Sequence, residues 1–140
     1  MQIRDVMTDS VVSVSPSDTI PNVAKKMNTH DIGIIPVCDN GSLLGVITDR
    51  DIVLRCVATD KDINSIKASD IMSSHAVSIS PNQSVEEAAN LMAKAQFRRL
   101  PVTDSGKIVG MVSIGDLARL NNYDMETAKA LSEISEDRYD

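Results

Sequence analysis

The sequence predicts a mixed α/β (α+β) fold made of two copies of one β-α-β-β-α unit, and three observations support this. Residues 5–53 align with residues 70–118 at a constant offset and without a gap. In each copy, apolar positions with helical spacing are followed by two short apolar runs typical of strands. A Gly-containing turn separates the two runs, as in a β-hairpin.

The internal repeat is the strongest of these observations. Many aligned positions are identical, among them Asp5/Asp70, Met7/Met72, Pro36/Pro101, Gly45/Gly110 and Asp51/Asp116. An ungapped repeat sets the architecture before any motif is considered. Two copies imply a pseudo-two-fold axis, and we expect paired ligand clefts between the copies.

Each copy begins with a short strand and a helix. Residues 11–16 form a predicted strand that ends at a proline. The helical stripe follows at i, i+3, i+4 and i+7. In the first copy it comprises Ile20, Val23, Ala24 and Met27, and in the second Val85, Ala88, Ala89 and Met92. Ser84 and Glu87 have the spacing of a capping box.

A hairpin and a second helix complete each copy. Residues 34–38 and 43–47 are apolar runs on either side of Asn40-Gly41, and the second copy has Ser105-Gly106 at that turn. A helix is then predicted from Asp51 or Asp116. The first two strands are joined through a helix, so we expect them to be parallel with a right-handed crossover.

The predicted organisation is one module with three parts. Residues 1–65 form the first repeat with its linker, residues 66–122 form the second repeat, and residues 123–140 form a tail. The tail carries a weak helical stripe, which comprises Met125, Ala128, Leu131 and Ile134.

Bulk properties exclude several classes of protein. The net charge of −6 disfavours non-specific nucleic-acid binding. No apolar run approaches the roughly 20 residues of a membrane span. Two cysteines do not indicate a disulfide framework. These features predict a cytoplasmic protein without nucleic-acid or membrane partners.

The sharpest motif is Gly-x-x-Thr/Ser-x-x-Asp at the junction of a strand and a helix. It contains Thr48 and Asp51 in the first copy and Ser113 and Asp116 in the second. One interpretation is a helix N-cap. The other is a nucleotide site, in which the helix N-terminus and the hydroxyl bind phosphate and the Asp binds two sugar hydroxyls.

A second motif is Arg98-Arg99, at the start of an otherwise apolar strand. The first copy has no cation at the aligned positions, so the fold does not require one. The arginines form either surface salt bridges or a clamp for phosphate, to which Arg presents a planar fork.

No catalytic constellation is visible. The histidines and cysteines lack metal-ligand spacing, and there is no nucleophile elbow and no P-loop. The sequence therefore predicts a protein that is not an enzyme and has no metal site and no catalytic cofactor.

These residues together resemble a stand-alone pair of CBS domains, also called a Bateman module. The resemblance runs from about residue 3 to residue 121. It rests on Asp5-Val6-Met7 and Asp70-Ile71-Met72, the Val-Ser-Val-Ser-Pro strand, Ile35-Pro36-Val37, Arg99-Leu100-Pro101-Val102 and the segment from Gly45 to Ile52.

The resemblance implies a regulatory sensor that binds AMP, ADP, ATP or a related adenosyl compound between two facing sheets, with the helices outside. Thr48, Asp51, Ser113 and Asp116 would contact ribose and phosphate, and Arg98 and Arg99 would contact phosphate. Adenine would lie against apolar side chains, namely Val12, Val77, Ile34 and Ile35.

The resemblance also implies a homodimer that acts on a separate effector protein. The second copy has Ser for Thr, and Gly115 where the first has Arg50, so the two sites are not equivalent. The alternative is a ligand-free dimerising interaction module, in which the same motifs are only helix caps and salt bridges.

Overall fold

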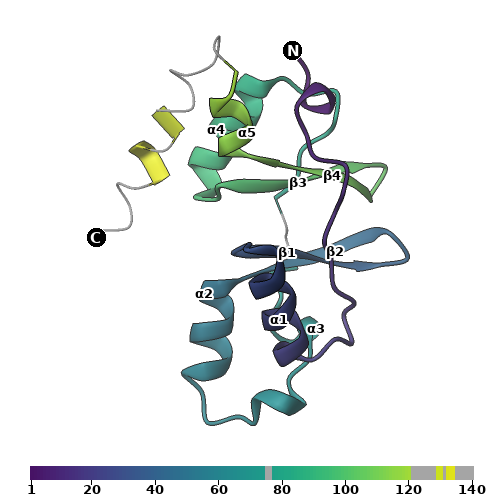
Figure 1. The fold of residues 1–140 in the computed structure, drawn as a ribbon, viewed down its shortest axis with the longest axis vertical. Coiled ribbons are helices and arrows are strands. Elements are labelled where there is room, and N and C mark those ends of the chain that lie inside the picture. The colour runs from purple at the N-terminus through teal and green to yellow at the C-terminus, as the bar shows by residue number, and fades with distance from the viewer. Residues whose placement is uncertain (75–76, 121–128, 131, 135–140) are drawn as a thin grey trace. The chain divides into compact units, whose positions relative to one another are not determined.

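The computed structural model describes residues 1–74, 77–120, 129–130 and 132–134. Its contacts divide the chain into two compact units. The first unit is Val12–Ala76, and the second combines Met1–Val11 with Val77–Asp140. In Figure 1 the purple N-terminal turn accordingly lies beside the green elements of the second unit.

The first unit follows the predicted order of helix, hairpin and helix. Its elements are α1 (Ile20–His30), β1 (Ile34–Asp39), β2 (Ser42–Thr48), α2 (Asp49–Ile52), the π-helix η2 (Val53–Val57), the 3-10 turn η3 (Ile63–Ser65) and α3 (Ala68–Ile71).

Helix α1 buries three of the four residues of its predicted apolar stripe, whereas Ala24 is exposed. Ile20, Val23 and Met27 face the core, and a proline occupies the first turn, where its missing N–H costs nothing. The helix ends at Asp31, which adopts the left-handed conformation with φ 52°. The predicted helix is confirmed.

The predicted hairpin is also confirmed. Strands β1 and β2 pair antiparallel from Ile34↔Thr48 to Asp39↔Ser42, which leaves a two-residue turn. Asn40 and Gly41 both have positive φ, at 50° and 82°. Positive φ at both turn residues matches the twist of the flanking strands.

The second unit repeats the order of helix, hairpin and helix. It contains η1 (Ile3–Asp5), α4 (Val85–Ala95), β3 (Arg99–Asp104), β4 (Lys107–Ser113) and α5 (Ile114–Ala118). Its hairpin turn, Ser105-Gly106, again has two positive φ angles, 53° and 81°.

The predicted first strand of each repeat is shorter than expected. In the first unit it is a single parallel bridge, Val14↔Val37, and in the second it is Ile79↔Val102. The parallel pairing agrees with the prediction. The strand is short because Ser15 and Pro16 follow at once, and a proline has no N–H for a ladder.

The capping box predicted at Ser84 forms only in part. The Ser84 hydroxyl accepts a hydrogen bond from the backbone N–H of Glu87 at 3.2 Å. The Glu87 carboxylate does not return to the Ser84 backbone, because it accepts from the Gln83 side-chain amide at 2.7 Å instead.

A segment from outside each hairpin completes each unit. In the first unit Ser73 bridges Val46 of β2, and in the second Thr8 bridges Met111 of β4. Residues 2–8 align with residues 67–73 in the repeat. Each segment therefore lies just before one repeat in the chain and packs with the other.

Each unit has its own aliphatic core. The first centres on Ile20, Val23, Ile35, Val37 and Ile47. The second centres on residues that include Ile3, Ile79, Met92, Leu100 and Leu117.

The predicted tail is described only in part. Residues 129–130 and 132–134 are helical, and Ala130 and Ile134 are buried in the second core. Met125, Ala128 and Leu131 lie outside the described residues. In the part of the chain that the structure describes, no helix has the length and apolar character needed to cross a bilayer.

Candidate functional site

The Thr/Ser-x-x-Asp motif lies where β2 meets α2 and where β4 meets α5. In the first unit the Thr48 hydroxyl accepts from the Asp51 backbone N–H at 3.1 Å. The Thr48 backbone N–H donates to Asp51 Oδ2 at 2.9 Å. These two bonds form a complete capping box.

The second unit repeats this geometry. The Ser113 hydroxyl accepts from the Asp116 backbone N–H at 3.1 Å, and the Ser113 backbone N–H donates to Asp116 Oδ2 at 2.8 Å. The structure therefore confirms that both motifs are helix caps. Because capping occupies one oxygen of each carboxylate, it leaves the other oxygen for a further interaction.

The two remaining oxygens differ in their surroundings. Asp51 Oδ1 lies 3.8 Å from Arg55 Nε, which is too long for a hydrogen bond. Asp116 Oδ1 accepts a hydrogen bond from Arg119 Nη2. The Asp51 and Asp116 side chains are only 16% and 13% exposed. Among the described residues, the nearly buried Asp51 Oδ1 is thus ion-paired with Arg55 but accepts no hydrogen bond, whereas Asp116 Oδ1 accepts one.

The backbone N–H groups at the start of the two helices also differ. The Asp49 N–H donates to Gly33 O at 2.9 Å, and the Arg50 N–H donates to Asp49 Oδ1 at 2.8 Å. The start of α2 thus has no free donor among these groups for a phosphate. At α5 the Ile114 N–H donates to Arg98 O, but the Gly115 N–H has no acceptor among the described residues.

The arginine pair begins β3. Arg99 lies opposite Ser113 in the hairpin register, and the Arg98 carbonyl accepts from Ile114, so both lie near the second motif. Both residues are exposed. Within residues 1–74, 77–120, 129–130 and 132–134, neither forms a salt bridge, which disfavours the salt-bridge interpretation.

The predicted adenine contacts are placed unequally. Val12 and Val77 are half-buried. Ile34 is 8% exposed and lies outside the core cluster, whereas Ile35 is fully buried inside it. Ile35 can meet a ligand only if that core opens, so Ile34 is the better candidate.

Sequence reasoning missed the basic residue that follows each motif Asp. Arg55 lies four residues after Asp51 and Arg119 three residues after Asp116, which are the spacings of neighbouring side chains on a helix. That spacing was a usable signal. For metals, no group of three or more His, Cys, Asp or Glu gathers among the described residues.

Comparison with known proteins assigns the repeats. The family model described as "CBS domain" matches twice, at residues 3–58 and 68–122. The CBS domain-containing protein YhcV of Bacillus subtilis is 46% identical over 134 residues, which cover 95% of this chain and 94% of YhcV.

Two solved structures are similar in fold. Hypoxic Response Protein I, solved with two coordinated zinc ions, has a TM-score of 0.79 and 36% identity. The match covers 85% of this chain and 98% of that one. CBSX2 in complex with AMP has a TM-score of 0.74 and 26% identity, over 84% of this chain and 93% of that one.

Proposed function

This chain belongs to the CBS-domain family, and from that premise we propose that it is a non-catalytic regulatory protein that binds an adenine nucleotide. The proposal is supported by the AMP complex of CBSX2, which has the same fold. The observation that carries the proposal is that Asp51 Oδ1 accepts no hydrogen bond from the described residues. A helix cap alone does not need that oxygen. No metal or catalytic cofactor takes part.

Asp51 would hold the ribose. Its free Oδ1 can accept from the two vicinal hydroxyls of a ribose. The Thr48 hydroxyl uses its oxygen for the cap and keeps its hydrogen for a phosphate or ribose oxygen. Ile34, Val12 and Val77 remain the predicted adenine contacts.

Arg98 and Arg99 remain the predicted phosphate contacts, as charge-assisted donors. Ser113 and the Gly115 N–H lie at the adjoining strand end. Since the chain has a net charge of −6, local cations are needed for an anionic ligand.

Calorimetric titration with AMP, ADP and ATP tests the proposal. Asp51→Ala should lose one cap, about 1 kcal/mol of stability. It should lose about 2–3 kcal/mol of nucleotide affinity, because the carboxylate would accept charge-assisted hydrogen bonds from the two ribose hydroxyls. Asp116→Ala should weaken binding less, because its second oxygen already bonds Arg119.

Asp5→Ala is the matched control, since Asp5 Oδ2 accepts the Gln2 N–H at 3.0 Å in an equivalent cap. It should lose stability without losing affinity. Arg98→Ala with Arg99→Ala should lower nucleotide affinity roughly 10²-fold and leave adenosine binding nearly unchanged. Normal nucleotide binding by Asp51→Ala would leave the motif as a cap only.

The second candidate function is a ligand-free dimerising module, and one observation favours dimerisation under either function. Val53, Leu54 and Val57 of η2 are 53%, 50% and 65% exposed. An apolar cluster of this kind on one helical turn suits a second copy of the chain. Sedimentation should give a dimer at micromolar concentration, and Val57→Glu should give a monomer. A wild-type monomer would contradict dimerisation.

Under both functions the output passes through a separate effector protein. A ligand can bias such a partner only if it binds one conformation of this protein more tightly than another. The two functions predict different thermal shifts. If the chain binds a nucleotide, a nucleotide concentration of about 100 times Kd should raise Tm by roughly 5–10 °C. If it is ligand-free, none of the three nucleotides should change Tm.

A further inference from the structure

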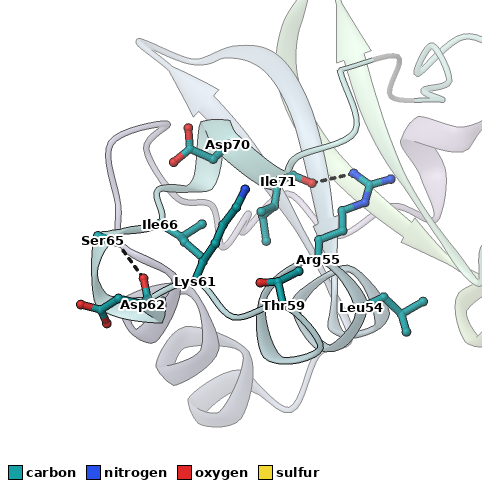
Figure 2. A pocket seen from close by; sticks show the side chains of 9 residues that line it. All are labelled: Leu54, Arg55, Thr59, Lys61, Asp62, Ser65, Ile66, Asp70 and Ile71. Atoms are coloured by element: carbon teal, nitrogen blue, oxygen red, sulfur yellow. Dashed lines mark hydrogen bonds between the residues drawn. The ribbon is translucent and has the colours of Figure 1, made fainter.

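A pocket of about 790 Å³ lies in the first unit. Its wall comes from the end of the π-helix η2, the linker that follows it and α3 (Figure 2). None of its lining residues is among the predicted nucleotide contacts. The volume falls in the range of small-molecule sites, about 300–1,000 Å³.

The linker between the repeats contributes much of this pocket. Thr59, Lys61, Ser65 and Ile66 line it, and all four fall between the two family matches. The pocket therefore lies partly outside the repeated unit.

Two cations, Arg55 of η2 and Lys61 of the linker, line the pocket. Arg55 Nη1 donates to the Ile71 carbonyl at 2.8 Å, which holds the guanidinium beside α3, and Arg55 Nε lies 3.8 Å from Asp51 Oδ1. The Lys61 ammonium forms no salt bridge with any residue that the structure describes. Figure 2 shows both side chains extending toward Ile71.

A π-helix positions Arg55. The Ala58 N–H donates to the Val53 carbonyl at 2.8 Å, five residues back, which defines the π-turn Val53–Val57. Such turns are rare and occur frequently at functional sites, because they redirect side chains at a cost in helix stability.

Two carboxylates also line the pocket. Asp62 accepts hydrogen bonds from the backbone and side-chain amides of Asn64, and Asp70 Oδ2 accepts the Lys67 N–H at 2.9 Å. Carboxylate oxygens favour hydrogen-bond donors near them. Ile66 and Ile71 supply an apolar surface.

We propose that this pocket binds a small organic oxyanion that also carries hydroxyl groups. The phosphate or carboxylate lies between Arg55 and Lys61, and the hydroxyls face Asp62 and Asp70. An Arg and a Lys together provide the fork and the point charge that bind oxyanions. The carboxylates of Asp62 and Asp70 disfavour a ligand with several phosphates. This site therefore differs in chemistry from the proposed nucleotide site.

NMR titration of the uniformly ¹⁵N-labelled chain tests the proposal with three probes: inorganic phosphate, glycerol 3-phosphate and glycerate. The amides of residues 54–55, 59–61 and 65–71 should shift. Glycerol 3-phosphate should bind more tightly than inorganic phosphate, because only it has hydroxyls. Comparison with glycerate identifies whether phosphate or carboxylate is preferred.

The variants localise the effect. Lys61→Met should lower the affinity for the tightest probe at least about tenfold, because it removes a charge-assisted contact. Lys61→Arg should retain most of the affinity. Lys25→Met, at an exposed position of α1 outside the pocket, is the matched control and should change nothing.

Three results would overturn the proposal. One is the absence of shifts with all three probes at millimolar concentration. Another is a set of shifts confined to residues 48–51, 98–99 and 113–116. The third is a set of shifts that Lys61→Met leaves unchanged. An AMP titration of Lys61→Met separates this proposal from the nucleotide proposal. AMP should still bind this variant at the proposed nucleotide site, whether or not the pocket is functional.

Discussion

Gly45 and Gly110 occupy equivalent places at which the backbone approaches another strand closely. A Cβ atom on Gly45 would lie 2.6 Å from the Ser73 carbonyl oxygen. On Gly110 it would lie 2.7 Å from Met7 Sδ and 2.8 Å from the Thr8 carbonyl oxygen. Neither glycine has a positive φ, so the requirement is for space and not for backbone freedom.

Gly45→Ala should therefore lower the stability by roughly 1–3 kcal/mol, because the bridging segment must move away from β2. Gly115→Ala is the control. Its Cβ would meet nothing closer than Ser113 Oγ at 3.6 Å, and Gly115 lies in α5, where Ala favours the helix. Thermal unfolding should show a lower Tm for Gly45→Ala and an equal or higher Tm for Gly115→Ala. Equal losses for both would contradict this explanation.

The candidate site was predictable at the residue scale only in part. The Thr48 and Asp51 spacing predicted the cap, because a cap is local and its partners are three residues apart. The occupied N–H groups at α2 were not predictable, since Gly33 O reaches Asp49 from a distant part of the chain. The pocket at Arg55 and Lys61 also escaped prediction, because it depends on how the linker folds back.

The two hairpins show how a turn sets the register of an element. Asn40-Gly41 has the residues that a turn with two positive φ angles prefers. Ser105 has φ 53° in the equivalent turn and carries a less suitable side chain. The same geometry is thus obtained from a better and a poorer turn sequence.

Ser105→Asn should stabilise the protein by a few tenths of a kcal/mol, because Asn tolerates the left-handed conformation better than Ser. Gly106→Ala should destabilise it. Its φ is +81° and no atom lies within 4 Å of the added Cβ, so the cost is one of backbone conformation alone. Urea unfolding measures both changes. A lower midpoint for Ser105→Asn would contradict the prediction.

Periodicity predicted the helices and hairpins because their determinants are local. It overestimated the strand at 11–16, where β-branched residues favour a strand but Pro16 ends the pairing after one bridge. The sequence pattern also predicted a complete capping box at Ser84, where only one of its two hydrogen bonds forms. The competing side-chain amide of Gln83 was not visible in the pattern.

At the scale of the whole molecule, the exchange of segments is the feature that the repeat did not reveal. The Ile3 N–H donates to the Gln83 carbonyl at 2.9 Å, and Ile3 is fully buried in the second core. In the first unit the Ala68 N–H donates to the Asp18 carbonyl at 2.8 Å in the equivalent way. A repeat alignment shows which segments are alike but not which copy each one joins, so the predicted boundaries at 65 and 122 describe chain order only.

Ile3→Ala should destabilise the second unit by about 2–5 kcal/mol, the usual cost of a cavity in a packed core. Amide hydrogen exchange should show the loss in α4, β3 and β4, although these lie far from residue 3 in the chain. Elements α1, β1 and β2 should keep more of their protection. Ile3→Val is the conservative control and should cost about 0.5–1.5 kcal/mol. Protection lost mainly in α1 and β1 would contradict the assignment of this segment.

The exchange has a consequence for synthesis on the ribosome. Thr8 and Met111 lie more than 100 positions apart, so residues 2–8 are translated well before the strand with which they pair. During translation, the edge of β2 is complete before residues 67–73 emerge to occupy it. Residues 2–8 share Asp and Met with those residues and are already present. Residues 2–8 are therefore available to the edge of β2 before residues 67–73 are, and any pairing made there would have to break before the native one forms.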